Sequence, residues 1–319
     1  MNPLLTRRNP PPVSAALLCL VLAAALAVGP ALAGNGDPVG GYPTYRERAI
    51  LALANACRQG PQAYRAAYLG DARILRAATY PAVPPLYWAL PLNRSARAHS
   101  IDMATTPCFQ HDSCDGTNLW DRIRGYYPGV TSMAENIASG YRSPLEVVNG
   151  WLLDGGAADH SHGDGHRRNL LSGQFRETGA GSAFGGPGGP YDTQDFGSGA
   201  PDFTTPLVSG SHVIDGKRLT FLASYDAHDG HAPREATLRI DDETIPMRLA
   251  FGTGANGTYR VTIPAGDECR SYRFRFRDAA GREWRHPEDG TLFTTGEGGC
   301  TKEYAPAGRE ERGDRTTGR

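Results

Sequence analysis

The chain has 319 residues, of which 40 are Gly and 24 are Pro, and 39% are hydrophobic. This composition supplies enough apolar material for packed domains and excludes a collagen, a coiled coil and a wholly disordered chain. The 33 Lys and Arg against 34 Asp and Glu give a formal net charge of −1, so the overall charge does not favour nucleic acid, whose protein partners are basic.

The first 33 residues have the pattern of a secretory signal peptide. A basic start at Arg7 and Arg8 precedes the apolar run Val13–Val28, and Ala31-Leu32-Ala33 is a small-residue cleavage signal. Because a membrane-spanning helix needs roughly 20 apolar residues and this run is shorter, we expect secretion and no stable membrane insertion.

If the chain is secreted, the five cysteines after the signal peptide enter an oxidising compartment, where disulfides persist. The sequence predicts the pairs Cys108–Cys114 and Cys269–Cys300. Cys57 is left unpaired or competes for Cys108 or Cys114.

Shifts in composition divide the chain. The expected parts are a signal peptide (1–33), a Gly/Pro-rich linker (34–43), a helix-rich domain (44–197), a second linker (198–205), a strand-rich domain (206–304) and a disordered polar tail (305–319).

Three helices are predicted in the first half. Apolar residues at helical spacing indicate helices over about 45–58 and 92–103. A third begins after Ser143, where Ser143 can cap the helix, Pro144 suits its first turn and Glu146 completes a capping box.

The second half alternates apolar and polar residues with a period of two, which is typical of half-buried strands. The runs lie at 219–225, 245–251, 259–263 and 272–276, with turn signals such as Asp215-Gly216 between them. About six or seven strands in about 100 residues favour an immunoglobulin-like sandwich.

Two further patterns suggest binding sites but have simpler explanations. Gly252–Gly257 matches the dinucleotide-binding pattern, but a strand follows it instead of a helix, so we interpret it as a hairpin loop. Arg273, Arg275 and Arg277 form a basic stripe that suits an anionic glycan, although a solvated outer face explains it as well.

Four ionisable residues of the helical half lie next to recognisable sequence features. These features are the loop between Cys108 and Cys114, an expected turn at 134–136, the end of the third helix and the dipeptide Gly165-His166. Two imidazoles and two carboxylates from separate elements suit Zn²⁺ or another divalent cation, with carboxylates as ligands, orienting groups or proton acceptors. Simple solvation of loop side chains is the alternative. The residues are His111, Glu135, Asp154 and His166.

Six ordered motifs resemble those of the CAP superfamily, which comprises cysteine-rich secretory proteins, antigen 5 and pathogenesis-related 1 proteins. They are 96–103, 109–112, 121–123, 134–138, 146–151 and 165–170, and the resemblance extends over about residues 44–197, close to half of the chain. The resemblance implies an α+β fold, a CAP α-β-α sandwich over 44–197 followed here by the all-β immunoglobulin-like sandwich. It also implies a cleft in which the same two histidines and two acids meet, with Asp154 the least regular match.

Relative to this family, residues 155–164 form an insertion. Its residues Asp159, His160, His162 and Asp164 either enrich the metal site or belong to a flexible loop. Three glycines nearby favour the loop.

The resemblance leaves two functions open. One is a secreted, non-enzymatic binding module with a divalent cation in the cleft and a lipid or sterol, cell-wall polymer or protein as ligand. The other is a zinc-assisted extracellular hydrolase of the peptidase type, in which Glu135 is the candidate catalytic base. We favour binding, because a catalytic zinc normally has three protein ligands.

Overall fold

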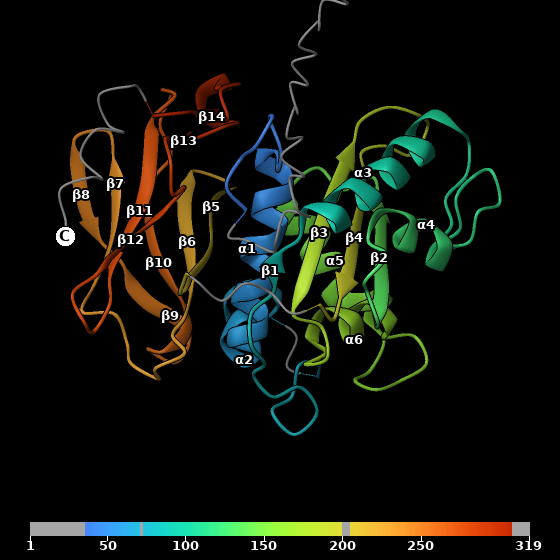
Figure 1. The fold of residues 1–319 in the computed structure, drawn as a ribbon, viewed down its shortest axis with the longest axis horizontal. Coiled ribbons are helices and arrows are strands. Elements are labelled where there is room, and N and C mark those ends of the chain that lie inside the picture. The colour runs from blue at the N-terminus through green and yellow to red at the C-terminus, as the bar shows by residue number, and fades with distance from the viewer. Residues whose placement is uncertain (1–35, 71–72, 200–204, 308–319) are drawn as a thin grey trace, which may run out of the picture.

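The structure is a computed structural model that describes residues 36–70, 73–199 and 205–307 (Figure 1). The predicted signal peptide, most of the 198–205 linker and nearly all of the expected tail lie outside the described residues. Among the described residues, no helix has the length and apolar character that a bilayer crossing requires.

The first half is a mixture of helices and short strands, and the three predicted helices are confirmed as α1, α3 and α5. Both α1 and α5 begin with a capping box, formed by Thr44 with Glu47 and by Ser143 with Glu146. The elements are α1 (Tyr45–Gln59), α2 (Pro61–Tyr64), η1 (Arg65–Leu69), β1 (Tyr87–Trp88), α3 (Leu90–Thr105), α4 (Leu119–Tyr126), β2 (Met133–Ser139), α5 (Pro144–Leu153), η2 (Asp154–Gly156), α6 (Gly165–Leu171), β3 (Glu177–Ala183) and β4 (Tyr191–Gly197).

These strands form one sheet in the order β1-β3-β4-β2, with helices on both faces. Helix α3 lies directly on β3, because Gly179 and Gly181 have no side chain to hold it away; a Cβ at Gly181 would lie 2.2 Å from the Arg97 nitrogen. Ala180, which points to the other face of the strand, belongs to the apolar core that contains α1 and α5.

The second half forms two sheets. One has the order β5-β6-β10-β9, and the other has the order β14-β13-β11-β7-β8 with β12 paired to β11. The strands are β5 (Leu207–Asp215), β6 (Arg218–Asp226), β7 (Glu235–Ile240), β8 (Glu243–Pro246), β9 (Arg248–Gly252), β10 (Asn256–Pro264), β11 (Ser271–Arg277), β12 (Glu283–His286), β13 (Thr291–Phe293) and β14 (Tyr304–Ala305), with a short helix η3 (Glu297–Gly299).

The predicted alternation is confirmed in β11, whose buried side chains share one core between the sheets with β6. It is wrong for β6, which is buried on both faces because α1 packs on its other side. The run predicted at 245–251 is not a single strand, because it divides at Met247 into β8 and β9, which belong to different sheets. Gly252–Gly257 lies in the β9–β10 hairpin, as predicted. The region is β-rich and two-sheeted, and its classification as immunoglobulin-like stays a prediction.

Helix α1 lies between the two halves of the molecule (Figure 1) and contacts β5, β6, β9 and β10 as well as β3 and α5. Every residue from Arg46 to Gln59 is buried, whereas the sequence indicated a single apolar stripe. Gln59 shows how the polar residues are accommodated, since its amide nitrogen donates to the Tyr225 carbonyl at 2.9 Å and to Asn256 Oδ1 at 2.8 Å.

Both predicted disulfides, Cys108–Cys114 and Cys269–Cys300, are present. Cys57 is unpaired and buried within α1, where burial raises the pKa of its thiol. Cys57 is therefore a packing residue of the core, and its thiol is protonated at neutral pH.

Candidate metal site

His111 lies in the loop that the Cys108–Cys114 disulfide closes after α3. Its backbone carbonyl accepts a hydrogen bond of 2.9 Å from Arg122 Nη1 on α4, and its side chain is half exposed. The disulfide and this hydrogen bond hold the imidazole at the surface of the sheet edge formed by β2.

Glu135 lies on β2, not in the turn that the sequence suggested for 134–136, because β2 pairs with β4 along its whole length. Its buried carboxylate contacts His111 Nδ1 through Oε1 at 2.8 Å, and Oε2 accepts a hydrogen bond from Arg122 Nη2. Burial raises the pKa of Glu135 to about 7, although Arg122 opposes the shift.

The protonation of His111 follows from the same neighbours. Burial and the positive charge of Arg122 lower the pKa of His111, which favours the neutral imidazole. With the Nδ1 hydrogen directed at Glu135, the lone pair of a neutral ring resides on Nε2.

A second histidine and carboxylate pair is formed by Asp154 and His166. Asp154 ends α5 in the left-handed backbone region, with φ of 49°, and its Oδ1 lies 2.7 Å from His166 Nδ1. The other oxygen, Oδ2, accepts from the backbone nitrogen of Arg167 at 3.2 Å. The side chain of His166 is 35% exposed, so its ring is accessible to solvent.

The two pairs are connected through asparagines on β2 and α6. Asn136 Nδ2 donates to the His166 carbonyl at 3.1 Å, and Asn169 Nδ2 donates to the Glu135 carbonyl at 3.1 Å and to Asn136 Oδ1 at 3.0 Å. Helix α6 is thereby tied to the strand that carries Glu135.

The carboxylates in both pairs are engaged within the protein through both oxygens, and each contacts one imidazole at Nδ1. Among the described residues, no three of His111, Glu135, Asp154 and His166 have ligand atoms that all lie within 4.8 Å of one another. Asp102, Cys108 and Cys114 do meet that distance, but their cysteines form a disulfide and have no thiolate to offer.

Three residues that the sequence did not mark complete this region. Arg122 bonds both Glu135 and the loop of His111, and buried His99 contacts the same loop through the Gln110 carbonyl at 2.9 Å. Asp195 is fully buried opposite Glu135 in the β2–β4 register, and burial raises its pKa well above the usual value. Arg122 and His99 lie inside motifs that resemble the family, but nothing in the sequence distinguishes Asp195.

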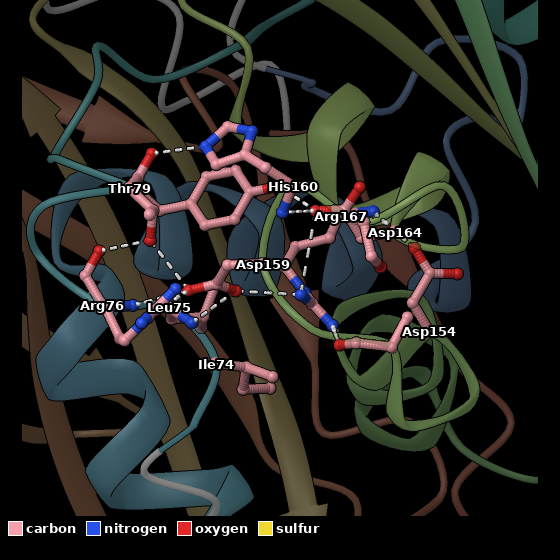
Figure 2. A network of polar contacts seen from close by, with 12 residues as sticks. Ile74, Leu75, Arg76, Thr79, Asp154, Asp159, His160, Asp164 and Arg167 are labelled. Atoms are coloured by element: carbon pink, nitrogen blue, oxygen red, sulfur yellow. Dashed lines mark hydrogen bonds and ion pairs between the residues drawn. The ribbon is translucent and has the colours of Figure 1, made fainter.

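Figure 2 shows how the 155–164 insertion is held against the segment 74–80. The buried carboxylate of Asp159 accepts from the backbone nitrogens of Leu75 and Arg76, each at 3.1 Å, from Thr79 Oγ1 at 2.8 Å and from Arg167 Nη1 at 2.9 Å. Its oxygens are therefore not available to a metal ion.

The other end of the insertion is anchored in the same way. Asp164 accepts from the Tyr80 hydroxyl at 2.7 Å and from Arg168 Nε at 2.6 Å. His160 stacks on Tyr80 with a centroid distance of 4.9 Å, and its Nε2 lies 3.1 Å from the Thr79 carbonyl oxygen. The expectation of a freely flexible loop is thus wrong at these residues, because buried ion pairs hold it in place.

Comparison with known proteins supports the resemblance seen in the sequence. Residues 52–196 match the family model described as the cysteine-rich secretory protein family, CAP. The uncharacterized protein YkwD of Bacillus subtilis (strain 168) is 33% identical over 90 residues, which are 28% of this chain and 32% of that protein. The match thus spans about a third of the curated relative.

Two solved structures show the same kind of partial similarity. An extracellular protein containing an SCP domain from Bacillus anthracis str. Ames is 26% identical with a TM-score of 0.35, over 48% of this chain and 40% of that one. An outer surface protein from Borrelia burgdorferi is 21% identical with a TM-score of 0.31, over 37% and 80% respectively. These scores are too low for a comparison residue by residue.

Proposed function

Because the chain belongs to the cysteine-rich secretory protein (CAP) family through residues 52–196, we propose that it is a secreted binding protein whose His111 and His166 hold a divalent cation, with Zn²⁺ as the first candidate. The predicted signal peptide and the secretory family support the proposed location.

The arrangement of the two imidazoles supports the proposed metal site. Each histidine has its Nδ1 against a carboxylate, at 2.8 Å in one pair and 2.7 Å in the other. Metal-binding histidines usually have such a partner, which fixes the tautomer and leaves Nε2 for the ion. His111 and His166 would hold the cation, while Glu135 and Asp154 would orient them.

A bound cation would supply positive charge and open coordination positions to an anionic or carbonyl group of a ligand. The ligand classes that fit remain a lipid or sterol, a wall polymer and a protein.

Binding is favoured over hydrolysis because Glu135 is already engaged. Each of its oxygens already has a partner, His111 or Arg122, so only part of their lone-pair capacity is left for a metal-bound water. Two imidazoles also fall short of the three protein ligands usual for a catalytic zinc.

Calorimetric titration of the full chain with Zn²⁺ tests the proposal. We expect His111→Ala and His166→Ala each to abolish or strongly weaken zinc binding, because each removes a ligand. His160→Ala, whose ring stacks on Tyr80 outside the two pairs, is the matched control and should bind like the wild type. Equal binding by wild type and both ligand variants would refute the metal site.

A separate experiment tests the alternative function, a zinc-assisted hydrolase. If a peptide or peptidoglycan library is cut in a zinc-dependent reaction by the wild type but not by Glu135→Gln, hydrolysis replaces binding as the function.

A further inference from the structure

A pocket of about 270 Å³ lies where the two halves of the molecule meet. Its walls come from the start of α1, the start of α5, the residue after β3 and the end of β5. Three of the residues that line it, Tyr45, Val213 and Ile214, lie outside the segment 52–196 that matches the family. The ten residues of α5 separate it from Asp154 by about 15 Å, so the pocket is distinct from the histidine and carboxylate pairs.

The walls of this pocket are mainly apolar. Val213 is 2% exposed and belongs to the core around α1, whereas Phe184 is 74% exposed. An exposed aromatic ring that continues an apolar wall offers a ligand a surface whose removal from water is favourable. The apolar residues that line the pocket are Tyr45, Pro144, Leu145, Phe184, Val213 and Ile214.

Among the described residues that line the pocket there are two arginines and no acid. The first, Arg46, is buried and already neutralised, because its Nε and Nη2 each bond one oxygen of Asp192 at 2.7 Å. Its guanidinium also donates to the carbonyls of Tyr141 and Arg142 and lies 5.7 Å from the centre of the Phe184 ring. Arg46 thus holds the wall in place and offers little charge to a ligand.

The second arginine, Arg142, is exposed, and its guanidinium forms no ion pair within the part of the chain that the structure describes. Next to it, Ser143 Oγ accepts from the Glu146 nitrogen at 3.2 Å, which leaves the hydroxyl hydrogen to donate. The Glu146 carboxylate accepts from the backbone nitrogens of both residues and does not line the pocket. Arg142 and Ser143 therefore place a positive charge and a hydrogen-bond donor beside the apolar walls.

The size of the pocket limits its ligand. Its volume is about nine times the roughly 30 Å³ that a water molecule occupies in the liquid, so about ten non-hydrogen atoms fill it, fewer than a sterol or a long acyl chain contains. A ring loses less rotational freedom on binding than a flexible chain of the same size. It can also pack against the rings of Tyr45 and Phe184.

We infer that this pocket binds a small aromatic carboxylic acid, with its ring against Tyr45 and Phe184 and its carboxylate bonded by Arg142 and Ser143. Charge-assisted hydrogen bonds from a guanidinium select a carboxylate over a neutral hydroxyl group. This site is additional to the proposed cation site and does not depend on it.

The test compares the dissociation constants of the full chain for phenylpropanoate, for the neutral phenylpropanol and for octanoate, measured by ligand-observed NMR. EDTA is present, so that no bound cation can hold the carboxylate. We expect phenylpropanoate to bind, and phenylpropanol to bind about tenfold or more weakly because it cannot form the charge-assisted bond. Octanoate should bind more weakly than phenylpropanoate, because its chain loses more rotational freedom.

Two variants separate the charge from the apolar wall. Arg142→Gln should weaken binding of phenylpropanoate by about tenfold or more and leave that of phenylpropanol unchanged. Phe184→Ala should weaken both by about threefold or more, because the ring contact is lost. The matched control is Arg124→Gln, which removes an exposed arginine of α4 outside the pocket and should leave both affinities unchanged.

The inference is overturned if phenylpropanoate does not bind, if phenylpropanol or octanoate binds as tightly, or if Arg124→Gln weakens binding as much as Arg142→Gln. Thermal melting without ligand confirms that each variant is folded.

Discussion

Two carboxylates, Glu135 and Asp154, each use both oxygens inside the protein, and each holds one histidine by its Nδ1. The identity of these residues is visible in the sequence, but their role depends on what each oxygen contacts. Glu135 is held by Arg122 from α4, and Asp154 by the backbone nitrogen of Arg167. Both acids therefore hold their histidine in a fixed orientation.

Glu283 offers a prediction for acid stability. Its bonds to Arg275 and Arg285 lower its pKa to about 2 from 4.5, so it stabilises the folded state fully above about pH 4.5 and loses this contribution as the pH falls through about 2. We expect Glu283→Gln to be less stable than wild type at pH 7 and this difference to shrink towards pH 2. Urea unfolding at about pH 7, 4 and 2.5 measures it.

The matched control is Glu235→Gln, because Glu235 is half exposed and lies 4.0 Å from Arg277. Such exposed pairs contribute little, so its unfolding should follow the wild type at every pH. If Glu283→Gln lowers the free energy of unfolding by the same amount at every pH, the carboxylate stabilises the fold by packing alone.

The contact between α3 and β3 depends on glycine. Asn93 and Ser100 of α3 bond the carbonyls of Ala180 and Gly181, at 2.6 Å and 3.0 Å, which requires the helix backbone to approach the strand closely. Helix α3 leads directly into the disulfide loop of His111. The position of that loop relative to the sheet therefore depends on how closely α3 packs on β3.

Gly181→Ala tests this packing. The added Cβ would meet the Arg97 nitrogen at 2.2 Å, and overpacking against backbone costs typically about 1–3 kcal/mol. Gly125→Ala in α4 meets nothing within 4 Å and should be neutral or slightly stabilising. The free energies of unfolding in urea distinguish them, and equal values for both variants would contradict the tight contact.

The whole molecule is built around α1. The helix is buried from Arg46 to Gln59, and its core includes Leu222 and Phe251 from the β-rich half as well as Trp151 from α5. Gly60, directly after the helix, lies so close to β9 that a Cβ there would be 2.7 Å from the Gly252 nitrogen. The β-rich half thus packs against the first half through a shared apolar core.

Phe251→Ala should therefore destabilise both halves together. Phe251 is 2% exposed and contacts the rings of Tyr64 and Tyr68, so its truncation should cost about 3–5 kcal/mol. Leu249→Ala on the same strand, 43% exposed, should change stability by about 0.5 kcal/mol at most. Urea unfolding of each variant is followed by circular dichroism and by tryptophan fluorescence. The two signals should give one coincident transition, and two separate transitions would disprove the coupling of the two halves.

Features that depend on neighbours in the sequence could be predicted. The capping boxes at Thr44 and Ser143, the alternation in β11, and the short disulfide loop around His111 are local patterns. The ordered motifs also pointed to the family model that residues 52–196 match, because their spacing along the chain is enough to recognise them.

Long-range packing decided the rest. Glu135 is on a strand because β4, which follows much later in the chain, pairs with it, and Asp159 is buried because the segment 74–80 supplies its hydrogen-bond donors. The pocket between the two halves likewise brings together Tyr45, Leu145 and Val213, which lie far apart in the sequence. Local propensity carries no information about such partners, since the free energy that favours them comes from burial and pairing that exist only in the folded chain.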